Sequence, residues 1–423
     1  MNQKTIVPKN LIFPFIIITS LFFMWGLANN MTDTLLAAFK KIMSMSDFQT
    51  SLIQLAFYGS YFCLALPAAI FIKKYTYKAG VLLGLGLFIL GALLFYPASI
   101  TKVYGHFLIA LFILAGGLSI LETTSNPYII MMGPAESGTR RLNLSQSFNP
   151  IGSITGVVLS NLFILSSLNS AGVQERANMT IKQLDLIKSS ELNAVMGPYV
   201  GVAFILLLLW ITIAVAKMPV GSDSQEQVNL GATVRRLLHN KKYYTGVIAQ
   251  FFYVGAQICV WSFTIRLVMS ELHINEQKSS NYYIAALILF VFARFVFTGL
   301  MKFINPRILL SISAILAMLS TSFVILGNGL LAVVALVLIS GFMSLMFPTI
   351  FGISVSGLGS DTKIGGSGLI MAILGGAILP LLQGKISDMT HSINISYIVP
   401  LICFIIIAWY GISSLKLDKS SAS

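Results

Sequence analysis

Twelve long apolar stretches follow one another along almost the whole chain, separated by short polar segments. A run of about 20 apolar residues is long enough to cross the hydrocarbon core of a bilayer as an α-helix. The strands of an outer-membrane barrel are only about 10 residues long and alternate in polarity, so the stretches disfavour that fold. Only 10% of the residues are charged, whereas a soluble protein carries about 25%. The sequence therefore predicts an all-α integral membrane protein with 12 transmembrane helices.

The distribution of Lys and Arg indicates which ends of the predicted spans face the cytoplasm. The spans are residues 11–37, 49–72, 79–99, 104–131, 142–167, 196–216, 243–269, 280–301, 307–327, 329–356, 364–387 and 393–415. With the N-terminus inside, the inner segments hold 17 of the 27 Lys and Arg and the outer segments hold nine, with Arg294 inside the eighth span. Cytoplasmic loops are enriched in Lys and Arg. We therefore predict cytoplasmic termini in a bacterial cytoplasmic (inner) membrane, and no nucleic-acid partner.

Two polar segments interrupt the regular spacing of the spans. Residues 168–195 are expected to form a long outer loop with balanced charges. Residues 217–242 are polar and hold the densest cluster of positive charge, as expected of a cytoplasmic linker. The linker would join two six-helix halves, an N-terminal one over residues 1–216 and a C-terminal one over residues 243–423.

A weak internal repeat supports the division into two halves. The residues from Gly117 to Pro127 have a counterpart about 224 residues later, from Gly341 to Pro348. Duplicated halves of a transporter place the substrate site at their interface, near the middle of the membrane.

Two acidic side chains lie inside predicted spans, Asp33 in the first and Glu122 in the fourth. A charge at the centre of a membrane costs at least ~2.5–3.5 kcal/mol, so such residues are candidates for function. A desolvated carboxyl group that is open to each side in turn can carry a proton across. The alternative is that each acid pairs with a cation and holds two helices together. Arg294 is the one cation within a span, so at most one acid can have an intramembrane partner.

Amide and indole side chains surround these acids at helical spacing. Pairs three or four residues apart share a helix face, and they are Asn29 and Asn30 with Asp33, Gln146 with Asn149, and Gln257 with Trp261. Amides donate and accept hydrogen bonds, as sugar hydroxyls require, and an indole stacks on the apolar face of a pyranose. The alternative is that the amides join neighbouring helices.

Several of these residues stand in motifs that resemble a known family. They are WGLANNMTD at 25–33, LETTSNP at 121–127, RLNLSQSFN at 141–149, YVGAQ at 253–257, Trp261, ARF at 293–295, PTIF at 348–351 and GSDTK at 359–363. The chain resembles the fucose–galactose–glucose:proton symporters of the major facilitator superfamily, and within them most closely the bacterial L-fucose permeases. The likeness covers nearly the whole chain.

The resemblance implies a proton-driven monosaccharide symporter that works by alternating access. It implies proton-coupling roles for Asp33 and Glu122. It implies a sugar site whose members are Trp25, Asn30, Asp33, Gln146, Asn149, Gln257, Trp261, Arg294 and Phe347. No catalytic residue, metal site or cofactor is implied, since the proton is the coupling ion. The expected partners are the sugar, the proton and the lipid bilayer, and the chain is expected to be a monomer.

Two departures from the family pattern bear on the substrate. Phe347 stands where the fucose-transporting members have a Tyr before the proline of span ten. The lost hydroxyl removes a sugar hydrogen bond and favours the glucose and galactose branch. The loop between spans two and three also lacks the acidic residue of the superfamily's usual gating motif.

Other functions stay open at this point. A sodium-coupled or uncoupled sugar carrier is the first alternative, with N-acetylglucosamine or mannose as further substrates, because carboxylates and amides also ligate sodium. An intramembrane enzyme is disfavoured, because the sequence has no nucleophile motif, zinc motif or phosphate-binding loop and no His near either buried acid. A sugar sensor is disfavoured by the short segment after the last span.

Overall fold

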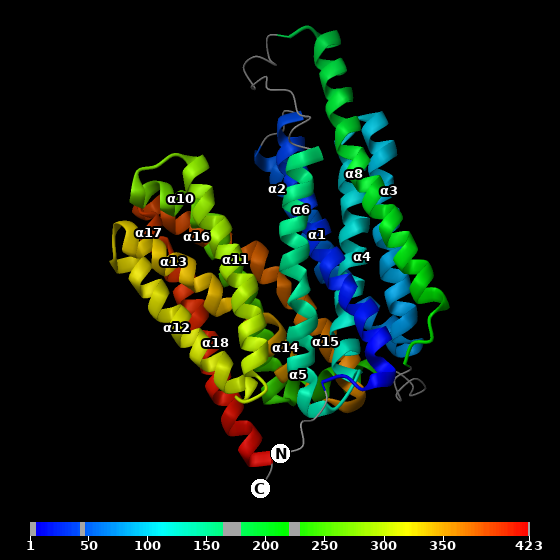
Figure 1. Cartoon of the computed structure of the whole chain (residues 1–423), viewed down its shortest axis with the longest axis vertical. Helices are drawn as coiled ribbons and strands as arrows, with labels where there is room; N and C mark the ends of the chain where they lie inside the picture. The colour runs from blue at the N-terminus through cyan, green and yellow to red at the C-terminus, as the bar shows by residue number, and fades with distance from the viewer. Residues whose placement is uncertain (1–5, 43–46, 164–178, 220–228, 422–423) are drawn as a thin grey trace. The chain divides into compact units, whose positions relative to one another are not determined.

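The computed structural model describes residues 6–42, 47–163, 179–219 and 229–421 (Figure 1). Within these ranges some helical side chains are also outside the description, among them those of residues 32–42 and 47–51. The described residues form helices and no strand, in agreement with the predicted all-α class.

The chain divides into two compact units, which we call the N-unit and the C-unit. The N-unit comprises residues 12–125 and 148–224, and the C-unit comprises residues 1–11, 126–147 and 225–423. The C-unit thus includes the last residues of the fourth predicted span and the start of the fifth, where α5 packs on α11 and α14 from the second half of the sequence. The division into six-helix halves with a linker over 217–242 therefore stays a prediction.

The N-unit is built from long helices that pack side by side. They are α1 (Ile12–Ile42), α2 (Asp47–Lys74), α3 (Tyr77–Thr101), most of α4 (Tyr104–Met131), α6 (Phe148–Phe163) and α8 (Ile181–Val215). The closest packing joins α1 to α6. A Cβ atom on Gly152 would lie 1.9 Å from the carbonyl oxygen of Phe23, and one on Gly26 would lie 1.9 Å from that of Asn149. Only glycine allows the two backbones to approach so closely.

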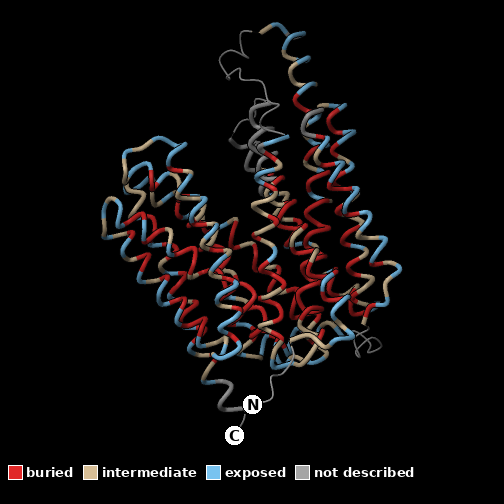
Figure 2. Tube along the Cα trace, viewed as in Figure 1, coloured by how far each residue is buried: buried red, intermediate tan, exposed pale blue. Residues whose placement is uncertain are grey.

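The C-unit places α10 at its centre. Its elements are η1 (Lys9–Leu11), η2 (Ala135–Ser137), α5 (Gly138–Gln146), α9 (Leu230–His239), α10 (Lys241–Leu272), α11 (Glu276–Leu300), α12 (Pro306–Leu326), α13 (Gly329–Met343), α14 (Met346–Val355), η4 (Gly359–Asp361), α15 (Thr362–Met371), η5 (Ala372–Leu374), α16 (Gly375–Thr390), α17 (Ile393–Ser396) and α18 (Ile398–Ser421). Helix α10 packs against α11, α13, α14, α16 and α18. Figure 2 shows buried residues concentrated on the inward faces of these helices, and the outward faces exposed.

Eleven helical segments of the described residues are long and apolar enough to cross a membrane, and they coincide with eleven of the predicted spans. The fifth predicted span, residues 142–167, begins on α5 and α6. Its last residues, 164–167, lie outside the described ranges.

Four predicted spans are each made of two helices rather than one. Span five breaks between α5 and α6, span ten between α13 and α14, span eleven at η5, and span twelve between α17 and α18. Pro150 and Pro348 follow the first two breaks. Proline has no N–H, so each removes the hydrogen bond to the carbonyl four residues before it. The carbonyls of Gln146 and Ser344 are therefore left without a partner within their own helices.

The expected outer loop over residues 168–195 is wrong in its second part, because α8 begins at residue 181. Thr180 and Gln183 form a capping box, in which each side chain bonds the other's backbone N–H. A capping box satisfies two of the free N–H groups at a helix start. Lys102, just after α3, also donates to Asp185 and to Ser189 of this extension, the second over 2.8 Å.

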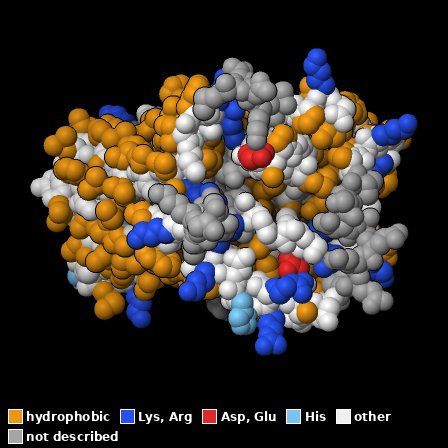
Figure 3. Space-filling view, turned by 90° about the horizontal axis from the view of Figure 1, so that it is seen from below, with side chains coloured by type: hydrophobic (Ala, Val, Ile, Leu, Met, Phe, Trp, Pro, Cys, Tyr) orange, Lys and Arg blue, Asp and Glu red, His pale blue; other side chains and the backbone are white. Residues whose placement is uncertain are grey.

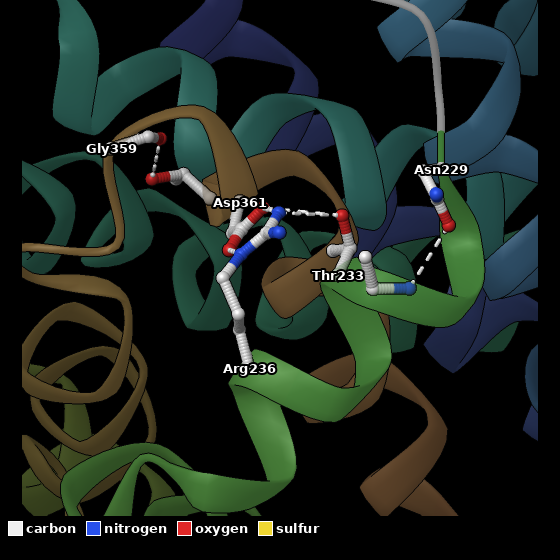
Figure 4. Close-up of polar contacts among 7 residues, drawn as sticks. Asn229, Thr233, Arg236, Gly359 and Asp361 are labelled. Carbon is white, nitrogen blue, oxygen red and sulfur yellow. Dashed lines mark hydrogen bonds and ion pairs between the residues drawn. The ribbon is translucent and has the colours of Figure 1, made fainter.

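The linker also contains a helix, α9, which is fastened to the start of α15. Arg236 donates to both carboxylate oxygens of Asp361, over 2.8 and 2.7 Å, and Thr233 donates to Asp361 over 3.3 Å (Figure 4). Asn229 caps the helix by accepting from the Ala232 N–H over 3.1 Å. The predicted linker is thus partly ordered against the C-unit.

Candidate functional site

Glu122 of α4 is buried, with 6% of its surface exposed. Its Oε2 atom has no hydrogen-bond partner, and within the described part of the chain it forms no ion pair. A buried carboxylate without a cation costs several kcal/mol. The group is therefore suited to holding a proton, and the alternative of a helix-pinning ion pair finds no support here.

The buried polar face of α4 extends beyond Glu122. Side-chain atoms without a hydrogen-bond partner follow on the same helix, and they are Thr123 Oγ1, Ser125 Oγ and Asn126 Nδ2. Buried polar atoms normally have partners in a protein. A run of unsatisfied atoms indicates a place where water or a polar solute binds.

The remaining predicted residues of the N-unit lie on α1 and α6. Trp25 is buried and stacks on Phe22 with 5.9 Å between ring centroids. Asn149 donates to the carbonyl of Phe22 over 3.2 Å, and Asn30 donates to that of Gly26 over 3.3 Å. Three predicted residues therefore lie along one stretch of α1 and its contact with α6. Asp33 is in α1, but its side chain lies outside the described residues.

Arg294 of α11 is the centre of the predicted residues in the C-unit. It is 3% exposed, yet within the described ranges it forms no ion pair. Its Nε donates to the carbonyl of Ser344 over 2.5 Å, and its Nη1 donates to the carbonyl of Gln146 over 2.9 Å. The guanidinium also lies over the ring of Phe290, 4.5 Å from the centroid. Main-chain oxygens and an aromatic face therefore compensate this buried charge.

The aromatic residues Trp261 and Phe347 each pack against another ring of the C-unit. Trp261 packs edge-to-face on Phe290 at 5.1 Å and donates from Nε1 to the Ser340 hydroxyl over 3.2 Å. Phe347, at the start of α14, is buried and lies 6.2 Å from the ring of Tyr253. Trp261 and Arg294 therefore share Phe290 as a neighbour, whereas Phe347 packs on Tyr253.

Two amides complete the predicted set in the C-unit. Gln146, the last residue of α5, is buried and donates from Nε2 to Asn126 Oδ1 over 2.9 Å. Gln257 is half-buried in α10, one turn before Trp261. Asn126 was not among the predicted site residues, although its place four residues after Glu122 on one helix face was a usable signal.

Arg141 is also a buried cation, which the sequence suggested as part of the positive charge expected inside and as the first residue of the motif at 141–149. It donates to the carbonyl of Ile129 over 2.7 Å, to that of Ile6 over 2.8 Å and to the Ser137 hydroxyl over 2.9 Å. It also donates to the carbonyl of Ile130, which Pro134 leaves free. Burial lowers the pKa of Arg141 to about 10, so the side chain stays charged at neutral pH. It fixes the segment between α4 and α5.

Within the described residues, no group of three or more His, Cys, Asp or Glu side chains is placed to hold a metal ion. The polar groups described above are carboxyl, amide, hydroxyl, indole and guanidinium groups. They are suited to hydrogen bonding and proton binding.

Comparison with known proteins identifies the family. Residues 16–372 match the family model of the Major Facilitator Superfamily. The chain is 42% identical to an L-fucose-proton symporter of Haemophilus influenzae, over 99% of this chain and 100% of that protein. It is 38% identical to the L-fucose-proton symporter of Escherichia coli, over 94% and 92%, and 32% identical to a glucose/galactose transporter of Brucella abortus, over 98% and 97%.

Solved structures give the same result. A crystal structure of the Escherichia coli fucose:proton symporter matches with a TM-score of 0.90 and 37% identity, over 95% of this chain and 98% of that one. A structure of FucP in the outward conformation matches with a TM-score of 0.91 and 37% identity, over 96% and 99%. The relatives are transporters, which confirms the prediction of a transporter and not an enzyme. The structural matches confirm the predicted fold. The chain is a multi-pass membrane protein and belongs to the Major Facilitator Superfamily.

Proposed function

We propose that this protein is a proton-coupled symporter that imports L-fucose or a related hexose. The observation that carries the proposal is the buried carboxyl group of Glu122, whose Oε2 has no partner. Two relatives that match nearly the whole chain are L-fucose-proton symporters, and they support the sugar and the coupling ion together.

Proton movement supplies the energy for uptake in this proposal. One charge that crosses a potential of 100 mV releases about 2.3 kcal/mol, which suffices for roughly 50-fold accumulation of a neutral solute. Glu122 takes up a proton from outside, the protonated carrier with its sugar changes conformation, and the proton leaves on the inner side. Asp33 lies further along α1 and has the second proton-coupling role in the proposal.

The sugar site of the proposal has nine members, which are Trp25, Asn30, Asp33, Gln146, Asn149, Gln257, Trp261, Arg294 and Phe347. Amides recognise hydroxyl groups, and the two indoles supply apolar faces for the sugar ring.

The proposed location is a bacterial cytoplasmic membrane, with both termini inside and the protein a monomer. Lys and Arg side chains are far more frequent than Asp and Glu on the face seen in Figure 3. Enrichment in Lys and Arg is typical of a cytoplasmic face, which supports this orientation.

The test is proton movement into sealed vesicles that hold the purified protein. L-fucose, D-galactose, D-glucose and N-acetylglucosamine are added in turn, and the internal pH is recorded. We expect acidification with L-fucose. No response to any of the four sugars, in vesicles shown to hold folded protein, would contradict the proposal; sodium-driven uptake would then be measured.

Glu122→Gln keeps the size of the side chain but removes the proton site. We expect this variant to bind sugar with near-normal affinity and to lose both acidification and accumulation. Binding is measured by calorimetry and accumulation by radiolabelled sugar. Normal accumulation would exclude the assigned role. Asp33→Asn is expected to reduce the initial rate of uptake strongly, and a near-normal rate would exclude a coupling role for Asp33.

A second candidate substrate class is glucose and galactose. Phe347 lacks the hydroxyl of the fucose-transporting members, and a relative at 32% identity is a glucose/galactose transporter. Acidification by D-galactose or D-glucose, without a response to L-fucose, would favour this class.

A further inference from the structure

Prolines leave the main-chain carbonyls of Gln146 and Ser344 without a helical partner. Pro150 stands four residues after Gln146, and Pro348 stands four residues after Ser344. In a regular helix the N–H of the fourth residue would bond each carbonyl, and proline has none. An unpaired buried carbonyl costs about 1–3 kcal/mol. Each break therefore needs a donor from elsewhere in the fold.

Arg294 supplies that donor to both breaks. Its Nη1 bonds the Gln146 carbonyl over 2.9 Å and its Nε bonds the Ser344 carbonyl over 2.5 Å. Gln146 is the last residue of α5, and Ser344 directly follows α13. The C-terminal end of a helix carries partial negative charge, so a cation is stabilised there. One guanidinium thus bridges the negative ends of two helices that are far apart in the sequence.

The hydrogen bond between Arg294 and the Gln146 carbonyl is the last of three hydrogen bonds along one face of α5. Arg140 Nε donates to the Thr298 carbonyl over 3.2 Å, and Asn143 Nδ2 donates to Thr349 Oγ1 over 3.1 Å. Residues 140, 143 and 146 are spaced by three and so lie on the same helix face. Together they join α5 to α11 and α14, which lie beside it in Figure 1.

Gly352 marks the closest approach within this series. A Cβ atom at this position would lie 2.7 Å from Thr139 Oγ1 and 3.1 Å from the Thr139 Cα. The α5–α14 contact therefore depends on the absence of a side chain at Gly352. We call the contacts of residues 139, 140, 143 and 146 with α11 and α14 the α5 seam.

We propose that Arg294 is the latch of the α5 seam and that release of the Gln146 carbonyl allows the inner side to open. The inference rests on the proposed alternating-access function. Helix α5 comes from the first half of the sequence, and α11 and α14 come from the second, so the halves part on this side only when the seam opens. Arg294 is thereby a positioning residue, which acts on the pathway through the two helix breaks.

The geometry explains why an arginine suits this task. The guanidinium carries donors in a rigid fork, whereas a lysine has one compact ammonium group. Nε and Nη1 point to two carbonyls at once, and each bond exchanges readily for one to water when the seam opens. Gln146 also bonds Asn126 through its side chain, so the latch adjoins residues of the proposed sugar site.

The test measures how readily the seam opens, without sugar and without a proton gradient. Thr298→Cys is introduced as a reporter after the three native cysteines are replaced by serine. This substitution keeps the main-chain carbonyl that Arg140 uses. The reporter is 5% exposed in the closed seam. A membrane-impermeant maleimide is then applied to inside-out vesicles, and the labelling rate is determined.

We expect Arg294→Ala to raise the labelling rate at least about tenfold, because the loss of a charge-assisted hydrogen bond of roughly 1.5 kcal/mol corresponds to a change of about that size. Arg294→Lys should give an intermediate rate, because an ammonium group cannot reproduce the fork. Arg266→Ala, which removes an exposed arginine of α10, should leave the rate unchanged. An unchanged rate in a folded Arg294→Ala protein would overturn the proposal.

A steric variant makes the test independent of the folding of the arginine variants. Gly352→Ala keeps Arg294 but forces Thr139 away from α14, and should also raise the labelling rate. Gly299→Ala is the matched control, because a Cβ atom there meets nothing within 4 Å. If Gly352→Ala and Gly299→Ala label at the same rate, the seam is not the closing contact. Because the readout needs no sugar, failure of the symporter proposal would leave this result interpretable.

Discussion

The buried arginines Arg141 and Arg294 are compensated mainly by the backbone. Arg141 bonds four main-chain carbonyls through Nε, Nη1 and Nη2, and Arg294 bonds two. Glu122, in contrast, keeps one oxygen without a partner. The difference separates two tasks: the arginines fix the shape of the chain, and the carboxyl group stays available for a proton.

Phe347 offers a direct test of sugar specificity. Phe347→Tyr restores the hydroxyl found in the fucose-transporting members. One neutral hydrogen bond contributes about 0.5–1.5 kcal/mol, so we expect the KM for L-fucose to fall roughly two- to tenfold. Transport kinetics in vesicles measure the effect. Phe347→Leu, which adds no hydroxyl, should not lower the KM; an equal fall in both variants would show that space rather than hydrogen bonding sets affinity.

The sequence was informative about which residues matter and less so about their partners. Glu122 and Arg294 stand out in any apolar span, because a charge there is costly. The hydrogen-bond partners of Arg294 were harder to predict. Every residue has a main-chain carbonyl, so the residue types do not reveal which carbonyls are free to accept a bond from the side chain. The prolines four residues after Gln146 and Ser344 were the available signal for two free carbonyls.

At the scale of helices, hydropathy located the spans but not the helix ends outside them. Helix α8 starts at residue 181, well before the predicted span at 196, because its first turns are polar and are stabilised by the Thr180 capping box. The breaks in spans five and ten were equally hidden, since a hydropathy window averages over a proline. Spacing of capping residues and prolines would have located both.

The contact of α1 with α6 makes a prediction about stability. Gly152→Ala would place a Cβ atom 1.9 Å from the Phe23 carbonyl, and overpacking of this kind costs about 1–3 kcal/mol or more. We expect the Tm of the purified protein to fall by about 5 °C. Thermal unfolding in detergent measures it.

Gly201→Ala is the matched control for that prediction. A Cβ atom on Gly201, in α8, meets nothing within 4 Å, and alanine is the better helix former. This variant should be as stable as the parent or slightly more so. A similar loss in both variants would mean that the close approach of α1 and α6 is not what limits stability.

At the scale of the whole molecule, the linker between the predicted halves is anchored rather than loose. Asp361 is buried, and Arg236 and Thr233 of α9 reach it from the linker. The sequence indicated a polar, basic segment here, but the pairing of residues 125 positions apart is a tertiary contact. Local pattern could not predict it.

Arg236→Ala tests this anchor. The Arg236 side chain is 57% exposed, so solvent screens the pair and its contribution is roughly 1 kcal/mol at most. We expect amide hydrogen exchange in α9 to become several-fold faster, as measured by mass spectrometry. The effect should shrink in 1 M salt, where exposed charges are screened within about 3 Å.

Arg235→Ala controls for the loss of one positive charge from the same helix. Arg235 is the exposed neighbour of Arg236, and its removal should leave exchange in α9 unchanged. Equal acceleration in both variants would attribute the effect to general charge and not to Asp361.

The bonds of Arg294 to main-chain carbonyls also bear on how this contact evolves. Every amino acid carries a main-chain carbonyl, so substitutions at positions 146 and 344 leave both acceptors in place. A substitution at position 294, in contrast, removes the guanidinium that donates both bonds. Pairwise covariation in an alignment requires that a change at one position favour a change at the other. We therefore expect no covariation between position 294 and position 146 or 344. We expect instead that Arg294, Pro150 and Pro348 are each retained independently in homologous sequences that keep this contact.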